Sequence, residues 1–269
     1  TEAGSLAANG FKELILVGIC LGAWGRDIFP PEIAKDVGSS GANLTDVLKA
    51  LEMLDGDFRI RLSSIEPKYV TDELIEFMAG SKRLCRHLHI PLQSGDDEIL
   101  KKMNRPYSTA EYRALIDKLR RAMPDIAITT DVMVGFPGER DVNFKNTLNF
   151  IKAIMPARTH IFRFSKRDGT PAYAMKPEID KNVVRRRYYA IKIAAVMSSY
   201  IYREAFKDKV VDVLVETKRD KFTGLLTGYS ANYIRVLFDG PDKLMGNIAP
   251  VRIEDINLTY TMGSSLKIS

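Results

Sequence analysis

The chain has 269 residues, enough for one large domain or for one medium-sized and one small domain. Apolar residues make up 45% and charged residues 28%, which is typical of a globular protein with a hydrophobic core. No apolar run approaches the roughly 20 residues that a membrane-spanning helix needs, and the first residues contain no secretory signal. We therefore expect no membrane association.

The chain contains two cysteines, Cys20 and Cys85, which form no Cys-x-x-Cys pair. They provide no disulfide framework, so we predict a cytoplasmic location and expect both to be small buried apolar residues. The first residue is not Met, and the sequence opens directly into a helical pattern. The chain is therefore expected to be a segment of a longer protein.

The net charge of +6 is unevenly distributed along the chain. Residues 156–207 contain twelve Lys or Arg and four Asp or Glu, whereas residues 205–269 contain nine and eight. A basic surface often contacts nucleic-acid phosphates, and it is also common on a solvated helix. Charge alone leaves both interpretations open.

Short apolar runs alternate with helical patterns over the first two thirds of the chain. A capping box at Ser108 and Glu111 begins one of these helices, and Thr71 is the predicted N-cap of another. Strand–helix alternation predicts parallel strands with right-handed crossovers, as in an α/β barrel. The predicted strands cover residues 13–19, 58–62, 87–92, 126–134 and 159–164.

The last third of the chain follows a different pattern. Residues 181–206 predict a long basic helix, and the sequence then changes to period-two alternation interrupted by glycines such as Gly228. This pattern is typical of a small antiparallel β-barrel. We therefore divide the chain into residues 1–204, which include the linking helix, and residues 205–269.

In a parallel α/β barrel, ligands bind at the carboxyl ends of the strands. Polar residues and glycines follow the predicted strands, and together they are suited to line a site for a polar small molecule. For any one of them, a role in stopping a strand or capping a turn is an equal alternative. The candidate cofactor-binding residues are Gly18, Ser63, Ser64, Glu66, Gln93, Ser94, Asp131, Gly135, Ser165 and Lys166.

Other catalytic schemes have little support. The chain has no dinucleotide fingerprint, Walker loop or nucleophile elbow. His87 and His89 would share one face of a strand, but His160 is expected to be distant and no Cys pair accompanies them, so we predict no metal site. Asp131 and Glu139 are a weakly supported acid–base pair. No catalytic residue can be assigned.

Four segments at these strand ends resemble the radical-SAM methylthiotransferase family, in family order and with family-like spacing. The C-terminal segment Gly228–Tyr233, with Gly246, is similar to the family's TRAM domain, a small RNA-binding β-barrel. The resemblance implies a partial radical-SAM barrel of five parallel strands followed by a TRAM-like barrel. The four segments are His89–Gly95, Met103–Tyr107, Asp131–Glu139 and Phe164–Ala172.

Two further segments, Gly18–Asp27 and Arg61–Pro67, resemble the subfamily that acts on threonylcarbamoyladenosine at position 37 of tRNA. The relatives that modify isopentenyladenosine usually have Gln-Asn in the first segment and Thr-Thr-Ser-His-Pro in the second. The resemblance therefore favours the first substrate and keeps the second as an alternative.

The resemblance also implies cofactors: S-adenosylmethionine and two 4Fe–4S clusters in the full-length protein. One cluster, on a Cys-x-x-x-Cys-x-x-Cys loop, would generate a deoxyadenosyl radical that abstracts hydrogen from C2 of the adenosine. A second cluster, on three other cysteines, would take part in sulfur transfer. None of these six cysteines is present, so this chain alone is expected to be inactive.

The resemblance implies the tRNA anticodon loop as a partner. Aromatic side chains can stack on bases and arginines can contact phosphates, although the tyrosines could equally pack inside the small barrel. A non-catalytic RNA-binding module and an ordinary α/β-barrel enzyme are the competing interpretations. The candidate RNA-binding residues are Arg185, Arg186, Arg187, Tyr229, Tyr233 and Arg235.

Overall fold

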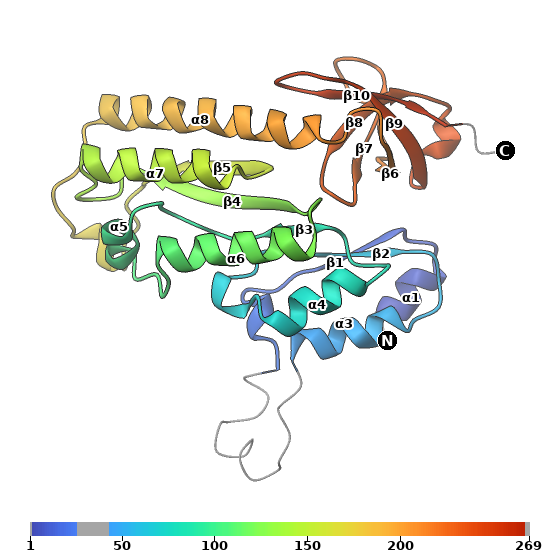
Figure 1. The fold of residues 1–269 in the computed structure, drawn as a ribbon, viewed down its shortest axis with the longest axis horizontal. Helices are drawn as coiled ribbons and strands as arrows, with labels where there is room; N and C mark the ends of the chain where they lie inside the picture. The colour runs from blue at the N-terminus through green and yellow to red at the C-terminus, as the bar shows by residue number, and fades with distance from the viewer. Residues whose placement is uncertain (1, 26–42, 267–269) are drawn as a thin grey trace, which may run out of the picture.

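A computed structural model describes residues 2–25 and 43–266 and shows two connected parts (Figure 1). The first is a parallel sheet with helices on its outer side. The second is a small β-barrel near the C-terminus, and the long helix α8 (Lys181–Glu204) packs along the first part and leads into the barrel. None of the described helices is long and apolar enough to cross a bilayer.

Five parallel strands form the first part, in agreement with the sequence prediction. The strands form two sheets: β1 pairs with β2 in one, and β4 lies between β3 and β5 in the other. The sheets are joined where Ser64 bridges His89 and where the Ile65 amide donates to the His89 carbonyl at 2.9 Å. The strands are β1 (Glu13–Leu16), β2 (Arg59–Leu62), β3 (His87–His89), β4 (Ala127–Val134) and β5 (Arg158–Arg163).

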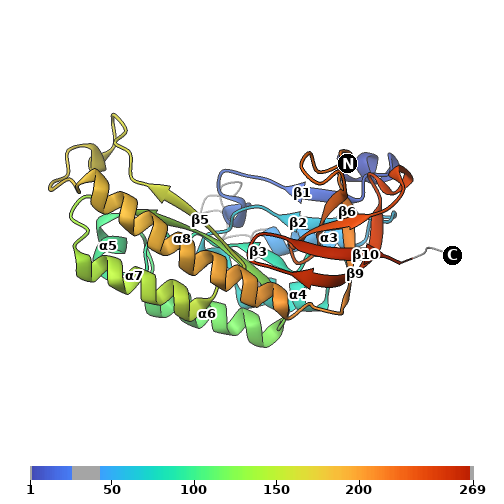
Figure 2. The ribbon, with the colours of Figure 1, turned by 90° about the horizontal axis from the view of Figure 1, so that it is seen from above.

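Helices cover the outer side of these strands and enclose the main hydrophobic core, which includes Leu48, Ile60, Leu88 and Tyr112. Figure 2 shows α6, α7 and α8 running side by side along β4 and β5, and these elements contact one another in that order. Helices α3 and α4 lie beside β1 and β2, and α5 lies at the far end of the sheet, near the start of α7 (Figure 1). The helices are α1 (Glu2–Ala8), α3 (Leu44–Glu52), α4 (Asp72–Gly80), α5 (Asp97–Lys102), α6 (Thr109–Ala122) and α7 (Asp141–Ile154).

Local capping signals begin the helices where the sequence predicts them. Ser108 accepts from the Glu111 amide at 3.2 Å, and Glu111 accepts from the Ser108 amide at 2.7 Å, which completes the capping box of α6. Thr71 caps α4 by accepting from the Leu74 amide. These caps satisfy amides that have no partner within the helix.

Two predicted strands end earlier than their apolar runs. β1 stops at Leu16, and beyond it Val17 is 76% exposed, because β1 lies at the edge of the sheet among the described strands. β3 stops at His89 because Pro91 has no amide hydrogen to donate. The chain nevertheless stays beside β4, since the Gln93 amide donates to the Asp131 carbonyl at 2.8 Å.

The small barrel is closed by five strands in the order β10-β8-β7-β6-β9. The prediction of a purely antiparallel barrel is wrong at one pair, since β10 runs parallel to β8. An odd number of strands cannot close with every neighbour antiparallel, so one parallel pair is required. The strands are β6 (Val210–Val215), β7 (Leu226–Ser230), β8 (Arg235–Asp239), β9 (Ile248–Ile256) and β10 (Thr261–Ser265).

The sequence context of Gly228 predicts a turn, but the residue lies within strand β7. A Cβ atom there would collide with the Leu214 carbonyl of the neighbouring strand. The barrel has its own apolar core, which includes Val213, Val236, Phe238 and Val251. The division of the chain at residues 204 and 205 stays a prediction.

Candidate functional site

The inner face of the parallel sheet carries many polar side chains beside the exposed Ile15 and Phe162, whereas its outer face is apolar. Alternate strand residues point to opposite faces, and the core-facing set includes Leu14, Ile60 and Leu88. The other set lines a cavity of about 1210 Å³ that is closed on one side by the small barrel. The polar residues on this face are Glu13, Arg59, Arg61, Ser63, His87, His89, Thr129, Asp131 and His160.

One end of the cavity contains a buried charge cluster. Glu13 accepts from Arg59 Nε at 2.5 Å and from Arg61 Nε at 2.9 Å, and all three side chains are at most 10% exposed. Burial opposes ionisation of Glu13, but hydrogen bonds and charge from Arg61 and Arg59 outweigh it and lower the pKa of that carboxyl. Glu13 is therefore ionised and compensates two buried guanidinium groups.

The same arginines connect the sheet to the small barrel. Arg59 donates to the carbonyls of Asp212 and Tyr229 at 3.1 and 2.8 Å. Arg61 donates to the carbonyls of Ser230 and Ala231 at 3.1 and 3.2 Å. These bonds use guanidinium hydrogens that Glu13 leaves free, so one buried cluster fixes the position of both parts.

A hydrogen-bonded series of side chains crosses the middle of the inner face. Thr129 Oγ1 lies 3.0 Å from His87 Nε2 and 2.9 Å from His89 Nδ1. His89 Nε2 lies 3.3 Å from one Asp131 oxygen, and His160 Nδ1 lies 3.5 Å from the other. The series therefore joins β3, β4 and β5.

Two of these histidines, His87 and His160, lie in surroundings that disfavour the protonated imidazole. Burial, assisted by the charge of Arg61, lowers the pKa of His87 to about 3. Burial and the nearby charge of Arg158 also lower the pKa of His160. Neutral imidazoles can both accept and donate hydrogen bonds, which suits them to bind a polar ligand.

The expectation that His160 lies far from the other histidines is wrong. The β4–β5 register pairs Asp131 with His160, so both side chains lie on the inner face. His89, Asp131 and His160 bring atoms suited to bind a cation within 4.8 Å of one another. One of the two reasons for predicting no metal site, the distance of His160, therefore does not hold, although the same atoms also suit the polar edge of an organic ligand.

Three predicted cofactor-binding residues line the cavity: Ser63, Ser64 and Asp131. The Ser63 hydroxyl is buried and has no hydrogen-bond partner among the described residues, as is also true of His87 Nδ1. Buried polar atoms without partners are uncommon in folded proteins. These two atoms fit a polar small molecule of the class of S-adenosylmethionine, and the cavity is large enough for it.

The other predicted cofactor-binding residues lie outside the cavity lining. Ser94 is fully buried and bonds Thr147, and the Gly135 amide donates to Glu139. Glu66 and Lys166 are engaged with Arg105 and Glu178, at 3.4 and 2.5 Å. The remaining three, outside the lining as well, are Gly18, Gln93 and Ser165.

The suggested acid–base pair of Asp131 and Glu139 is also not formed. Glu139 is absent from the cavity lining, and its side chain is 1% exposed and pairs with Arg187 at 2.7 Å. Burial raises the pKa of Glu139, although the Gly135 amide and Arg187 oppose this shift. Arg187 holds the start of α7 by also pairing with Asp141 at 2.7 Å.

The predicted RNA-binding residues fall into separate groups. Arg185 and Arg186 are exposed on α8, whereas the Arg187 side chain is 6% exposed and belongs to the ion pair with Glu139. Placing all three arginines on one binding surface is therefore wrong, because their turn of helix directs Arg187 inward.

Tyr229 and Tyr233, two of the candidate RNA-binding residues, are half-buried where the small barrel meets the sheet. Tyr233 stacks on His87 with ring centroids 4.4 Å apart and on Tyr229 at 5.0 Å. Arg235 is exposed, as predicted, and pairs with Asp220 at 2.9 Å.

The two cysteines do not fit an iron–sulfur cluster. Cys20 is exposed and Cys85 is buried. Burial raises the pKa of Cys85 to about 11, so its sulfur stays a thiol, whereas cluster iron binds thiolate. Cys85 is buried as predicted, and the prediction for Cys20 is wrong.

Much of the polar inner face lies away from the strand ends, where the sequence predicts the site. Glu13, Arg59, Arg61, Thr129 and His160 lie within strands, where attention to the strand ends does not reach. The alternation of charged and apolar residues in Arg59–Leu62 was the available signal.

Comparison with known proteins agrees with this architecture. The Radical SAM superfamily profile matches residues 27–151. The chain is 37% identical over 256 residues to the threonylcarbamoyladenosine tRNA methylthiotransferase MtaB of Thermotoga maritima, covering 95% of this chain and 55% of that protein. It is 35% identical over 270 residues to MtaB of Bacillus subtilis, covering 99% and 57%.

A third relative has a different named product. The tRNA-2-methylthio-N(6)-dimethylallyladenosine synthase of Lachnoclostridium phytofermentans is 33% identical over 266 residues, covering 99% of this chain and 56% of that protein. The chain thus spans little more than half the length of these curated relatives. On this sequence similarity, the chain belongs to the radical-SAM methylthiotransferase family.

Proposed function

We propose that the chain is part of an enzyme that adds a methylthio group to C2 of N6-threonylcarbamoyladenosine at position 37 of tRNA. The match to the Thermotoga maritima protein carries this proposal, because it runs through both the parallel sheet and the small barrel. The segment Arg61–Pro67, which resembles the same subfamily, contributes Arg61, Ser63 and Ser64 to the cavity.

Within the enzyme, the inner face of the sheet would bind S-adenosylmethionine, which supplies the radical and the methyl group when the full cofactor set is present. Ser63 and His87 offer unpartnered polar atoms, and Asp131 can accept from an ammonium or hydroxyl group. The two 4Fe–4S clusters need thiolates other than Cys20 and Cys85. This chain alone is therefore inactive, and formation of 5′-deoxyadenosine by it after treatment with iron and sulfide would contradict this.

The small barrel, with the exposed Arg185 and Arg186 of α8, would bind tRNA near the anticodon loop. A non-catalytic RNA-binding role remains the alternative for this chain by itself. The relatives named for dimethylallyladenosine favour the isopentenyladenosine derivative as a second candidate substrate.

Mass spectrometry of tRNA nucleosides, from cells in which the gene is disrupted, tests the substrate. We expect loss of 2-methylthio-N6-threonylcarbamoyladenosine, accumulation of the nucleoside without the methylthio group, and no change in 2-methylthio-isopentenyladenosine. Loss of the isopentenyl product instead would establish the second substrate. If neither nucleoside changes, the proposal of tRNA methylthiolation is wrong.

A further inference from the structure

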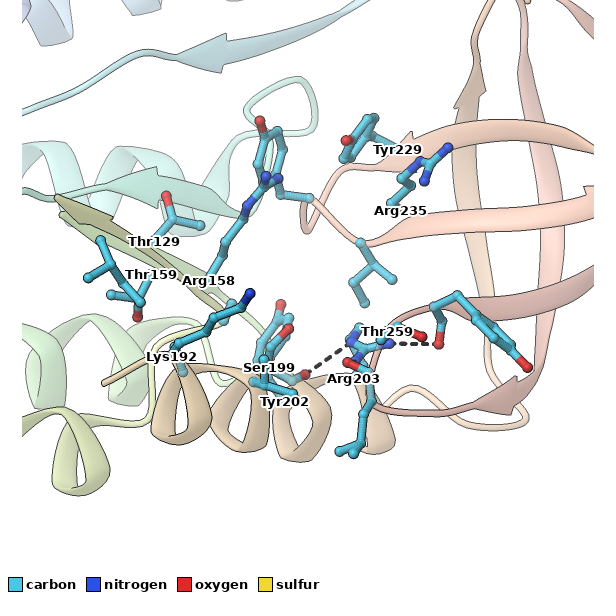
Figure 3. A pocket seen from close by; sticks show the side chains of 18 of the residues that line it. Thr129, Arg158, Thr159, Lys192, Ser199, Tyr202, Arg203, Tyr229, Arg235 and Thr259 are labelled. Carbon is cyan, nitrogen blue, oxygen red and sulfur yellow. Dashed lines mark hydrogen bonds between the residues drawn. The ribbon is translucent and has the colours of Figure 1, made fainter. Parts of the chain in front are cut away.

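A second cavity, of about 600 Å³, lies between β5, α8 and the small barrel. Figure 3 shows the side chains of Arg158 and Lys192 pointing from β5 and α8 into this space, with Tyr229 and Arg235 on the barrel opposite. We call this cavity the basic cleft. The basic cleft is distinct from the polar cavity on the inner face of the sheet, but the two share some lining residues.

The basic cleft is lined by four cationic side chains and, among the described residues, by no Asp or Glu. Two of the cations are already engaged. Arg203 donates to the carbonyls of Asn257, Leu258 and Tyr260. Arg235 pairs with Asp220, which lies outside the lining.

Arg158 and Lys192 are the cations that remain available. Both are exposed, and within the described part of the chain neither has an ion pair or a side-chain hydrogen bond. The Thr159 hydroxyl, also in the lining, is buried without a hydrogen-bond partner. Two uncompensated positive charges beside an unused hydroxyl favour an anionic ligand with oxygen acceptors, such as a phosphate.

The cleft also contains stacked aromatic rings. Tyr229, Tyr233 and Thr129 line both this cleft and the polar cavity, so the two spaces meet at these residues. The rings of His87, Tyr233 and Tyr229 form a continuous series of stacked contacts at 4.4 and 5.0 Å. Tyr233 has a positive φ of 60°, an uncommon conformation that fixes its ring at the junction.

We propose that the basic cleft binds a single-stranded segment of RNA, with phosphates at Arg158 and Lys192 and a base stacked against Tyr229. Uncompensated cations beside aromatic rings form the combination by which proteins bind single strands. A strand placed there lies next to the polar cavity, on the path by which a nucleoside could reach it past Tyr233. The inference rests on the proposed function and assigns RNA contacts to residues of the sheet and α8.

Fluorescence anisotropy with a labelled octamer of adenosine ribonucleotides and with an unmodified tRNA transcript tests the cleft on this chain. The variant Arg158→Gln/Lys192→Gln should bind both RNAs about tenfold more weakly at low salt. Its slope of log affinity against log salt should be smaller by about 1.4, since each phosphate contact on a single strand contributes about 0.7. Tyr229→Ala should weaken binding about tenfold, and Tyr229→Phe should retain it.

The matched control is Lys101→Gln/Lys152→Gln, which removes the same charge from exposed positions on α5 and α7. If the cleft variant and this control have the same affinity and salt slope, the cleft proposal is overturned. If tRNA binding persists in that case, the proposed function stands without the cleft. If the unaltered chain binds neither RNA, the cleft and the RNA-binding part of the proposed function both fail.

Discussion

The polar cavity and the basic cleft meet at Tyr233, yet Arg59 and Arg61 of the cavity differ from Arg158 and Lys192 of the cleft in burial and in partners. In the polar cavity, Arg59 and Arg61 are buried, paired with Glu13 and bonded to carbonyls of the small barrel. In the cleft, Arg158 and Lys192 are exposed and, among the described residues, unpaired. The difference teaches that a basic residue count says little about ligand binding until the partners of each cation are known.

The largest loss of stability is expected for Glu13→Gln, which removes the negative charge between the two buried arginines Arg59 and Arg61. We expect a loss of about 3–5 kcal/mol in the free energy of unfolding, because the guanidinium groups stay buried without compensation. Urea unfolding measures it. The exposed carboxylate Glu73, paired with Lys49 at 2.7 Å, is the control, and Glu73→Gln should cost less than about 1 kcal/mol. If Glu13→Gln and Glu73→Gln lower the free energy of unfolding equally, Glu13 does not stabilise the buried arginines.

The variant Arg187→Ala tests whether Arg187, near the start of α8, stabilises the fold or binds RNA. Removing Arg187 leaves the buried Glu139 carboxylate without its main partner, and we expect a destabilisation of about 3 kcal/mol. Its neighbour Arg186 is exposed, so Arg186→Ala should change stability by less than about 0.5 kcal/mol. Thermal and urea unfolding of both variants check this difference. If Arg187→Ala keeps the stability of the unaltered chain but binds RNA more weakly, Arg187 is an RNA-binding residue after all.

The neutral state of His87 makes stability depend on pH. The unfolded His87 binds a proton near pH 6.5, whereas the folded one does so only near pH 3. Between these values the unfolded chain holds more protons, so stability falls as the pH falls. From pH 6.5 to 5 the loss should be about 1.6 kcal/mol, and His87→Gln should remove it.

Unfolding curves at several pH values measure this slope, with the less buried His160→Gln as the control. If His87→Gln and the unaltered chain have the same pH dependence, His87 does not stay neutral in the folded protein.

The smallest expected effect is that of Arg185→Gln/Arg186→Gln. These arginines are exposed on α8 beyond the basic cleft, so their phosphate contacts are screened by salt. We expect tRNA affinity to fall about threefold, under 1 kcal/mol, with a flatter salt dependence and no change in stability. Binding titrations at three salt concentrations measure the affinity and its slope against salt. If neither changes, Arg185 and Arg186 do not contact tRNA.

Much of the fold follows from local sequence. The alternation of short apolar runs with helical patterns, together with the caps at Thr71 and Ser108, predicts five parallel strands and their helices, because these signals depend on neighbours in the chain. Strand ends were less predictable. Val17 continues an apolar run but lies beyond the last strand pairing, and pairing depends on a partner that the run itself does not specify.

The candidate site was predicted only in part. Ser63, Ser64 and Asp131 line the polar cavity, whereas Ser94 and Gly135 follow strands just as directly but face packed neighbours. Position after a strand is a local property. The direction of a side chain depends on the register of neighbouring strands, and no single segment encodes that register.

The sequence by itself determined the family, the strand–helix order and the small barrel at the end, because these depend on motifs and periodicity along the chain. Only the tertiary structure decided which charges are free. It brings His160 beside Asp131, directs Arg187 onto Glu139 and leaves Arg158 and Lys192 unpaired among residues 2–25 and 43–266. The physical reason is that a cation's energy depends on its burial and on partners distant in sequence, which only the folded chain brings together.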